Sequence, residues 1–453
     1  MKKIVIIGGC AAGPKVAAKC RRMNKENEIH LYTNENIVSY SACGLPYYIE
    51  GIVPKIENLI IRTPEEFRES GVNVHIDHTC TKIIPDEKAV IINDKKVHYD
   101  ELVLCTGARA KEVKIEGGHL KNVYKLRTIQ DGIAIREKIK TAKTAVIIGG
   151  GYIGIEILEA LIANNIKVVM LEAGEQILSN FDKDIAKIIQ NYIHKKDGDK
   201  VTIREKTKVD KIVGKEEFVG IITDSGEVIE ADFCIVATGV VPNTEIASEA
   251  GIETGRSGAI RVDNRMQTNI KHIWAAGDCC EKHCLITKVP MYISLGSIAN
   301  KEGRVCAINV SGGDEKFEGI LCSFVTRYFD FTISTTGLTE QHALEYSKFI
   351  DIEPIAATVK KHDRAGYMPN TNEITLKLVA DKRTGEVLGA QAVGKGDADK
   401  RINIATSAIK SKMTIDELIN LDLTYAPSFG TPIDPLLEAA YKLKKIIDTK
   451  RHS

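Results

Sequence analysis

Cys43 is the residue whose type and surroundings point most directly to chemistry. It lies in the segment SYSACGLPYY, residues 39–48, which contains no second cysteine. A lone redox-active thiol can form a mixed disulfide with an external thiol, or a sulfenic acid after attack on a peroxide. The following GLPYYI predicts a short helix, whose backbone dipoles would favour the thiolate. Taken by itself, a cysteine is more often a buried packing residue, so this interpretation needs support from the rest of the chain.

Two glycine-rich segments could bind nucleotide phosphates. VIIGGCAAG at residues 5–13 and VIIGGGYIG at residues 146–154 repeat one pattern, in which a β-branched run turns through glycines into a helical sequence. Glycines permit the tight turn and the close approach of a pyrophosphate to the helix N-terminus, which attracts anions. The candidate residues of the first loop are Gly8, Gly9, Ala11, Ala12 and Gly13, and those of the second loop are Gly149, Gly151, Tyr152, Ile153 and Gly154.

The residue that follows the next strand decides how a ribose would be held. After the second loop, a full G-x-G-x-x-G, Glu172 follows the strand KVVML and could accept a hydrogen bond from a ribose 2′-hydroxyl. No arginine comes next to receive a 2′-phosphate, so we expect NADH to be preferred over NADPH. In the first loop Cys10 replaces the middle glycine, and only Thr33 or Glu35 is available for the ribose. Taken alone, the first segment could equally be a structural turn.

Parallel strands and helices must position these residues. Two strands end in Thr-Gly, with Thr106 and Gly107 in ELVLCTG and Gly239 in FCIVATG, and IWAAGD places Gly277 and Asp278 after a further apolar strand. Beyond about residue 320 the pattern changes to alternating stretches such as ITLKLVA. We therefore predict an α/β protein with two dinucleotide-binding, Rossmann-like folds and a separate α+β C-terminal domain.

Composition and charge exclude several other classes of protein. The chain has 453 residues, of which 62 are basic and 61 acidic, giving a net charge of +1. This balance recruits neither nucleic acid nor an anionic membrane, so an anionic ligand needs a local cluster of cations. The 11 cysteines are an odd number, several within apolar runs, which indicates a reducing compartment. The apolar run before the first glycines is too short for a signal peptide, so we expect a cytoplasmic protein with a small-molecule substrate.

The two glycine loops in this order, the Thr-Gly strand ends and IWAAGDC resemble the FAD-dependent pyridine nucleotide-disulfide oxidoreductases over essentially the whole chain. The resemblance implies an FAD fold at residues 1–112 and 246–322, interrupted by an NAD(H) fold at residues 113–245. It also implies a dimerisation domain at residues 323–453. The first loop would then bind FAD, with Asp278 on its ribityl chain, and the second loop would bind NADH.

Within that family, the surroundings of Cys43 resemble the single-cysteine branch. Dithiol members carry C-x-x-x-x-C, but Tyr48 stands five residues after Cys43, so Cys43 would work alone. The branch contains coenzyme A-disulfide reductases and NADH-dependent persulfide reductases, besides NADH oxidases and peroxidases. The oxidases and peroxidases carry a histidine in the first loop, where this chain has Ala11. The reductases carry asparagine before the cysteine, and Ala42 here makes a coenzyme A persulfide or polysulfide a plausible preference over the symmetrical disulfide.

A basic stripe follows the first loop and could bind the phosphates of coenzyme A. Lys15, Lys19 and Arg22 fall at i, i+4 and i+7 of the expected helix, and they match coenzyme A contacts of the resembling reductases. Such a stripe is also common on a solvated helix face. The residues expected on the opposite face are Val16, Cys20 and Met23.

The resemblance also implies further substrate contacts and a second subunit. Ser39 and Asn300 would contact the substrate. Tyr367 in GYMPN and Tyr425 in TYAPSFG match a tyrosine pair that reaches the cysteine from the partner subunit, although either could be an ordinary interface residue. We therefore expect a homodimer whose active sites are shared across the interface.

Three alternatives for the function follow. The first is a reductase that uses NAD(P)H to reduce coenzyme A disulfide, or a coenzyme A persulfide or polysulfide, through a mixed disulfide on Cys43. The second is an NADH oxidase that forms water or peroxide. The third is a non-catalytic, redox-sensing flavoprotein.

A tight C-C-x-x-H-C cluster stands apart from these motifs. It consists of Cys279, Cys280, His283 and Cys284. Adjacent residues rarely supply the tetrahedral geometry that a structural metal needs, so we expect no metal here and a surface loop instead.

Overall fold

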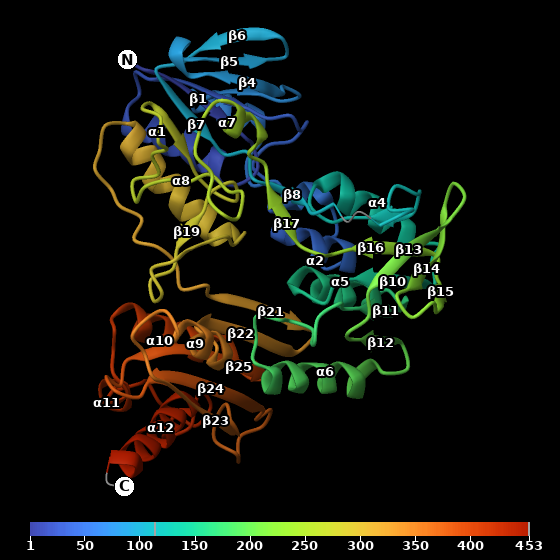
Figure 1. Cartoon of the computed structure of the whole chain (residues 1–453), viewed down its shortest axis with the longest axis vertical. Coiled ribbons are helices and arrows are strands. Elements are labelled where there is room, and N and C mark those ends of the chain that lie inside the picture. Colours follow the sequence, from blue (N-terminus) through green and yellow to red (C-terminus); the bar gives the residue numbers. More distant parts are fainter. Residues whose placement is uncertain (113–114, 452–453) are drawn as a thin grey trace.

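The structure is a computed structural model of the chain, and it describes residues 1–112 and 115–451. Three regions each contain one large sheet (Figure 1): the first lies at the top, the second at the right and the third at the bottom. Residues 113 and 114, where the sequence predicts the boundary between the first two folds, lie outside the described residues.

The first sheet is parallel and has the order β18-β7-β1-β2-β3. Its strands are β1 (Lys3–Ile7), β2 (Glu28–Tyr32), β3 (Asn73–His75), β7 (Glu101–Leu104) and β18 (Ile273–Ala275). The connection from β1 to β2 is α1 (Ala12–Met23), which packs against α8 (Gly296–Val310). Because both faces of the sheet are covered, its central strand β1 is apolar along its whole buried length, Ile4 to Ile7.

The second sheet is also parallel and has the order β12-β11-β10-β16-β9. Its strands are β9 (Val123–Tyr124), β10 (Thr144–Ile148), β11 (Lys167–Leu171), β12 (Val201–Arg204) and β16 (Phe233–Val236), and its main helices are α4 (Ile129–Ile139), α5 (Tyr152–Ala163) and α6 (Lys183–Asp197). All of these elements come between β7 and β18 in the sequence. The second fold is therefore inserted into the first, as the sequence predicts.

Smaller elements complete these two regions. The first carries an antiparallel sheet of β4 (Cys80–Ile84), β5 (Ala89–Ile92) and β6 (Lys95–His98), and the second one of β13 (Val209–Gly214), β14 (Phe218–Thr223) and β15 (Val228–Glu230). The two-stranded pairs are β8 (Ala108–Ala110) with β17 (Val240–Pro242) and β19 (Lys282–His283) with β20 (Pro290–Met291). The short helices are η2 (Ile56–Leu59), α3 (Pro64–Glu69), η3 (Pro85–Glu87) and α7 (Glu245–Glu249).

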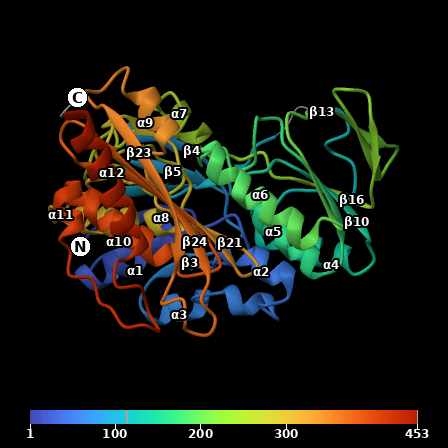
Figure 2. The same cartoon turned by 90° about the horizontal axis from the view of Figure 1, so that it is seen from below.

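The third region is an antiparallel sheet with helices packed on it, which confirms the predicted α+β domain. Its order is β21 (Phe324–Tyr328), β22 (Phe331–Gly337), β25 (Val387–Gly394), β24 (Glu373–Asp381) and β23 (Pro354–His362). Its helices are α9 (Glu340–Tyr346), α10 (Ala398–Lys410), α11 (Ile415–Ile419) and α12 (Pro435–Arg451). Helix α6 of the second region packs against this sheet, and both views show it there (Figures 1 and 2).

The segment around Cys43 leaves the first fold and packs on the second. It forms η1 (Ala42–Gly44) and then α2 (Leu45–Glu50), which contacts α4 and α5. Leu45 and Ile49 are buried in the same apolar core as Ile155 of α5. Because this core holds α2, it fixes the position of Cys43 between the two folds. Across residues 1–112 and 115–451, no helix combines the length and apolar character needed to cross a bilayer.

Candidate active site

One cavity of about 660 Å³ brings together the first glycine loop and Cys43. We call it the Cys43 cavity. The predicted site residues that line it are Ala11, Ala12, Lys15, Arg22, Ser39, Cys43, Gly107, Gly277, Asp278 and Asn300. Lys19 is not among its lining residues, although Lys15 and Arg22 of the same stripe are. The cavity is therefore formed by segments that are far apart in the sequence.

The first glycine loop has the geometry of a phosphate-binding turn. Gly8 has a φ of +116°, and a Cβ there would lie 2.0 Å from the carbonyl oxygen of Cys105. A Cβ on Gly13 would lie 1.9 Å from the oxygen of Gly8, so α1 can pack this close to the loop only if residue 13 is a glycine. Helix α1 begins without a side-chain cap and without an acidic residue in its first turn. Its terminal N–H groups thus remain free for an anion.

At the next strand end of the first fold, the two residues expected to hold a ribose form hydrogen bonds within the protein. Thr33 is 3% exposed, and its hydroxyl accepts a hydrogen bond from the backbone N–H of Glu35 at 3.3 Å. The carboxylate of Glu35 accepts a hydrogen bond from Tyr40 at 2.9 Å. Nearby, the N–H of Ser39 donates to the oxygen of Gly9 at 2.7 Å, which ties the segment before Cys43 to the glycine loop.

Asp278 is held in the Cys43 cavity by an arginine that the sequence analysis did not identify. Nη2 of Arg127 donates to Oδ2 of Asp278 at 2.7 Å, and Nε of Arg127 donates to the oxygen of Ala108 at 2.9 Å. Arg127 comes from the second region, just before α4, and no motif marks it. On the neighbouring Thr-Gly end, the hydroxyl of Thr106 donates to the oxygen of Asn243 at 2.6 Å.

A buried ion pair lies behind Asp278. Nζ of Lys282 lies 3.7 Å from Oε2 of Glu302, and their side chains are 1% and 0% exposed. Lys282 donates to the oxygen of Gly277 at 2.6 Å, while the N–H of Gly277 donates to Glu302 at 2.8 Å. Burial raises the pKa of Glu302 to about 7. The pair thus holds both backbone polar groups of Gly277, the residue before Asp278.

These observations fit FAD at the first loop. The uncapped start of α1 would receive the pyrophosphate, and Asp278 would accept hydrogen bonds from the ribityl hydroxyls. Gly277 has a φ of +91°, and a Cβ there would lie 2.9 Å from the Cβ of Ala12. The backbone at Gly277 therefore packs against the first loop at a distance that leaves no room for a side chain.

Cys43 is an exposed thiol in the cavity, but its environment does not favour the thiolate. The surrounding walls raise its pKa by desolvation, and the carboxylates of Glu156 and Asp278 raise it further. The charge of Arg127 and the N–H of Gly296 lower the pKa without offsetting these effects. The expected helix does follow Cys43, but desolvation and the two carboxylates outweigh the groups that lower the pKa of its thiol. Helix α2 has only six residues, and two carboxylates act against it.

The second loop has the same kind of glycine turn as the first, but a glutamate follows its next strand. Gly149 has a φ of +111°, and a Cβ there would lie 2.5 Å from the oxygen of Ala237. Gly151 faces open space, and α5 starts there with Tyr152 and Ile153, without a side-chain cap. Glu172 accepts hydrogen bonds from the N–H groups of Gly150 and Gly174, both at 2.7 Å.

The Thr-Gly end next to the second loop also offers a free group. The hydroxyl of Thr238 is buried without a hydrogen-bond partner in the described part of the chain, and Gly239 has open space beside it. An open helix start, a fixed carboxylate and an unpartnered hydroxyl fit NADH.

Tyr367 and Tyr425 do not line the Cys43 cavity of their own chain. They are 77% and 48% exposed and lie in two loops of the third region that contact each other, since the N–H of Ala365 donates to the oxygen of Pro427 at 3.2 Å. Fully buried Arg401 ties both loops together, because it bonds to the oxygen of Asp363 at 2.8 Å and to Asp434 at 3.0 Å. Their role across a dimer interface stays a prediction.

The C-C-x-x-H-C cluster is not a surface loop. Cys279 and Cys280 are 0% exposed because they lie in the apolar core of the first sheet, and Cys284 is 3% exposed. The expected surface loop is therefore wrong, and only His283 is exposed. No three such ligand side chains in residues 1–112 and 115–451 are grouped to hold a metal ion. On α1, Val16 and Cys20 are buried as expected, but Met23 is 44% exposed at the helix end.

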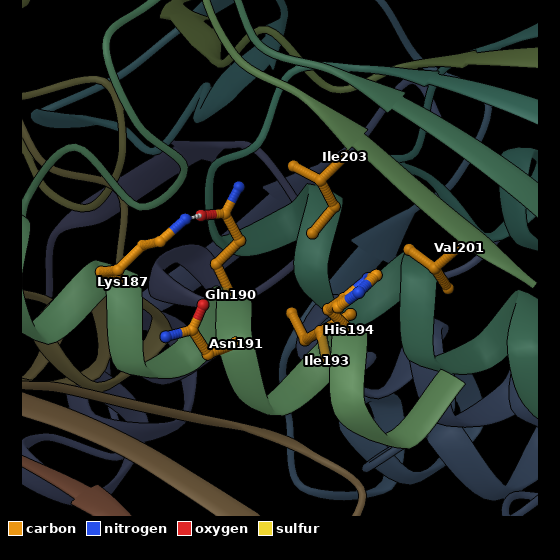
Figure 3. A pocket seen from close by; sticks show the side chains of 7 residues that line it. All are labelled: Lys187, Gln190, Asn191, Ile193, His194, Val201 and Ile203. Atoms are coloured by element: carbon orange, nitrogen blue, oxygen red, sulfur yellow. Dashed lines mark hydrogen bonds between the residues drawn. The ribbon is translucent and has the colours of Figure 1, made fainter. Parts of the chain in front are cut away.

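A second, smaller pocket lies outside this site. It has a volume of about 230 Å³ and lies between α6 and β12 (Figure 3). Lys187 and Gln190 at its edge are hydrogen-bonded to each other at 2.8 Å, and none of the predicted site residues lines it. We therefore place the chemistry in the Cys43 cavity.

Comparisons with known proteins agree with this geometry. A family model described as "Pyridine nucleotide-disulphide oxidoreductase" matches residues 2–303, and the dimerisation domain of that family matches residues 324–434. The "NAD(P)H sulfur oxidoreductase (CoA-dependent)" of Pyrococcus abyssi is 36% identical over 449 residues, 98% of each chain. The "NADH oxidase" of Methanocaldococcus jannaschii is 36% identical over 454 residues, 98% of this chain and 99% of that one.

A solved structure is similar over almost the whole chain. The NAD-dependent persulfide reductase of A. fulgidus matches with a TM-score of 0.95 and 35% identity, covering 99% of this chain and 84% of that one. The chain therefore belongs to the pyridine nucleotide-disulphide oxidoreductase family, and it is an NAD(P)H-dependent flavoprotein enzyme with that family's dimerisation domain.

Proposed function

We propose that this protein uses NADH to reduce a coenzyme A persulfide, polysulfide or disulfide, with Cys43 as the thiol that forms the mixed disulfide. The observation that carries the proposal is the Cys43 cavity, which is lined by the exposed thiol of Cys43 and by cations that suit a phosphate-bearing substrate. The names of the relatives from Pyrococcus abyssi and A. fulgidus, which act on sulfur with coenzyme A and on persulfides, support it.

The sulfur chemistry balances around Cys43. Its thiolate attacks one sulfur of the substrate, so that a bond to Cys43 forms, the S–S bond of the substrate breaks and a thiolate leaves with a proton from solvent or a donor. FAD bound at the first loop would supply the two-electron transfer that links NADH to this sulfur. With coenzyme A disulfide the overall reaction consumes one NADH and one proton and gives NAD⁺ and two coenzyme A thiols.

We also propose that Tyr425 and Tyr367 act from the partner subunit. Their exposure and the fixed loops that carry them support this placement. A phenol could donate a hydrogen bond to the leaving thiolate as its charge develops. The double variant Tyr425→Phe, Tyr367→Phe should then lower kcat with coenzyme A disulfide while reduction of the flavin by NADH is unchanged. A fully active double variant would contradict the assignment.

An NADH oxidase is the second candidate, because the relative from Methanocaldococcus jannaschii carries that name. Ala11 stands in the first loop at the edge of the cavity, where its methyl group can supply no proton to a reduced oxygen species. We therefore favour the sulfur acceptor, and oxygen consumption without any disulfide separates the two functions.

The test compares acceptors and one variant. NADH oxidation is measured with coenzyme A disulfide, coenzyme A persulfide, polysulfide, glutathione disulfide and oxygen, using wild-type protein and Cys43→Ser. We expect the wild type to prefer the coenzyme A acceptors, and Cys43→Ser to retain FAD and its reduction by NADH. The variant should keep no more than a few per cent, roughly, of the turnover with sulfur acceptors. Full sulfur turnover by Cys43→Ser, or a wild type that uses oxygen fastest, would overturn the proposal.

A further inference from the structure

Arg62 lies at the Cys43 cavity, although no glycine loop or basic stripe includes it. It lies between η2 and α3 and lines the cavity with Lys15 and Arg22 of α1. Its neighbour Ile61 is 72% exposed and also lines the cavity, so this segment forms part of the outer wall. Three cations from two separate segments therefore meet at one cavity.

The side chain of Arg62 is held in place by α3. Its guanidinium carbon lies 4.4 Å from the centre of the Phe67 ring, and Phe67 is 2% exposed. Nη2 of Arg62 donates to the oxygen of Glu66 at 2.6 Å. A capping box of Thr63 and Glu66 fixes the start of α3 immediately after Arg62. The arginine is thus pre-organised, and the remaining donors of its guanidinium stay available.

The charge at this wall is not compensated by the protein. In residues 1–112 and 115–451, neither Arg62 nor Lys15 nor Arg22 has a carboxylate within ion-pair distance. The acidic residue that lines the cavity, Asp278, is paired with Arg127. In a chain with a net charge of only +1, three unpaired cations around one concave site favour a ligand with several negative charges.

We propose that Arg62 is a phosphate-binding residue for the sulfur substrate and selects thiols that carry phosphate groups. The inference rests on the proposed function, because it takes coenzyme A as the carrier of the sulfur. A planar guanidinium presents paired donors that match two oxygens of a phosphate, while its face stays on Phe67. The thiol arm without phosphates, pantetheine, gives Arg62 no partner.

The experiment compares two disulfides that share the thiol arm. kcat and KM are measured on FAD-loaded wild type, Arg62→Ala and Arg62→Lys with coenzyme A disulfide and with pantethine, the phosphate-free disulfide. We expect Arg62→Ala to raise KM for coenzyme A disulfide roughly tenfold or more and to leave pantethine, kcat and the KM for NADH unchanged. Arg62→Lys should recover part of the loss, because lysine keeps the charge but not the paired donors.

Arg68→Ala is the matched control. Arg68 lies on α3, is paired with Glu65 at 3.0 Å and does not line the cavity, so its loss should leave both KM values unchanged. An unchanged KM for coenzyme A disulfide in Arg62→Ala, an equal rise with pantethine, or the same rise in Arg68→Ala would each overturn the role of Arg62.

A binding measurement separates this proposal from the proposed function. Adenosine 3′,5′-bisphosphate, the nucleotide end of coenzyme A, is titrated into wild type and Arg62→Ala without any turnover. Weaker binding by the variant supports Arg62 as a phosphate contact even if no coenzyme A acceptor is reduced, an outcome that would overturn only the proposed function. Equal binding by the two proteins would overturn the contact.

Discussion

The two glycine loops of this chain make matching backbone contacts. Gly8 donates to the oxygen of Tyr32 and Gly149 donates to the oxygen of Leu171, each at 2.8 Å. Both glycines have a φ above +110°, and a Cβ on either would meet a carbonyl oxygen of the neighbouring parallel strand. The turn that receives a pyrophosphate is thus built twice from the same local rules.

The surroundings of the two loops differ. The second loop faces Glu172, which two backbone N–H groups hold at the strand end, whereas the first loop faces buried Thr33. A buried pair, Lys282 with Glu302, supports the chain beside the first loop. The comparison indicates that the glycines provide phosphate binding in general, and that neighbouring side chains decide which nucleotide each loop takes.

We expect the largest effects from adding one methyl group to each loop, because the two variants should lose different functions. Gly8→Ala should prevent retention of FAD, because its Cβ would overlap the oxygen of Cys105 at a φ that disfavours alanine. Gly149→Ala should retain FAD but be reduced by NADH roughly a thousandfold more slowly or worse. Flavin absorbance of the purified proteins and stopped-flow reduction measure the two losses. Loss of FAD in Gly149→Ala would contradict the assignment of FAD to the first loop and NADH to the second.

The buried pair beside the first loop should matter more than an exposed pair beside the second. Lys282→Met leaves Glu302 buried without its partner, so we expect the protein to lose about 3–5 kcal/mol of stability and to release FAD more readily. Lys206→Met removes an exposed pair with Glu175 at 2.8 Å and should leave the stability nearly unchanged, because solvent screens exposed charges. Urea unfolding and FAD release are measured for both.

The double variant Lys282→Met, Glu302→Gln provides the control for that prediction. It removes both charges, while the glutamine oxygen can still accept from the N–H of Gly277. Stability should therefore be partly recovered, because both variants also lose the hydrogen bonds of Lys282 to the oxygens of Gly277 and Cys280. A double variant as unstable as Lys282→Met alone would show that these lost hydrogen bonds and lost packing, and not the unpaired charge, cause the effect.

Glu302 should also give the stability of the holoenzyme a pH dependence. Its pKa is raised from 4.5 to about 7 in the folded protein, so the folded state binds more protons than the unfolded state between these values. Its contribution to stability is therefore present below about pH 4.5 and is lost as the pH rises to 7, by no more than roughly 3 kcal/mol. The urea midpoint of wild type relative to Glu302→Gln, measured from pH 5 to pH 8, should fall. A constant difference would rule out this titration.

We expect the smallest effects, on the KM for the nicotinamide cofactor, from the glutamates that follow the second strand of each nucleotide fold. Glu172→Ala should raise the KM for NADH roughly tenfold and change the KM for NADPH less, because only NADH offers a 2′-hydroxyl to the carboxylate. Glu35→Gln is the counterpart in the first fold and should change neither KM, since Glu35 is bonded to Tyr40. Equal kcat/KM for NADH and NADPH in the wild type would contradict the role of Glu172.

Much of the fold could be predicted because its signals are local. A glycine that must adopt a positive φ, an apolar strand covered on both faces and an alternating strand are each specified by a few neighbouring residues. Gly8 and Gly149 show this directly, as do β1 and β10. The errors arose where long-range packing decides. The segment after Asp278 is predicted to be a surface loop, but Cys279 and Cys280 fill an apolar core.

The sequence by itself determined that two nucleotide folds stand before an α+β domain and that Cys43 lacks a second thiol in its segment, and its resemblance to a known family implied that one fold is inserted in the other. Only the tertiary structure decided which charges surround that thiol. Arg62, Arg127 and Asp278 come from three distant segments, and they line one cavity together with residues of α1, α3 and α8. Electrostatic interaction depends on distance and burial, neither of which a linear pattern contains. For that reason the raised pKa of Cys43 and the cluster of cations that lines its cavity appear only in three dimensions.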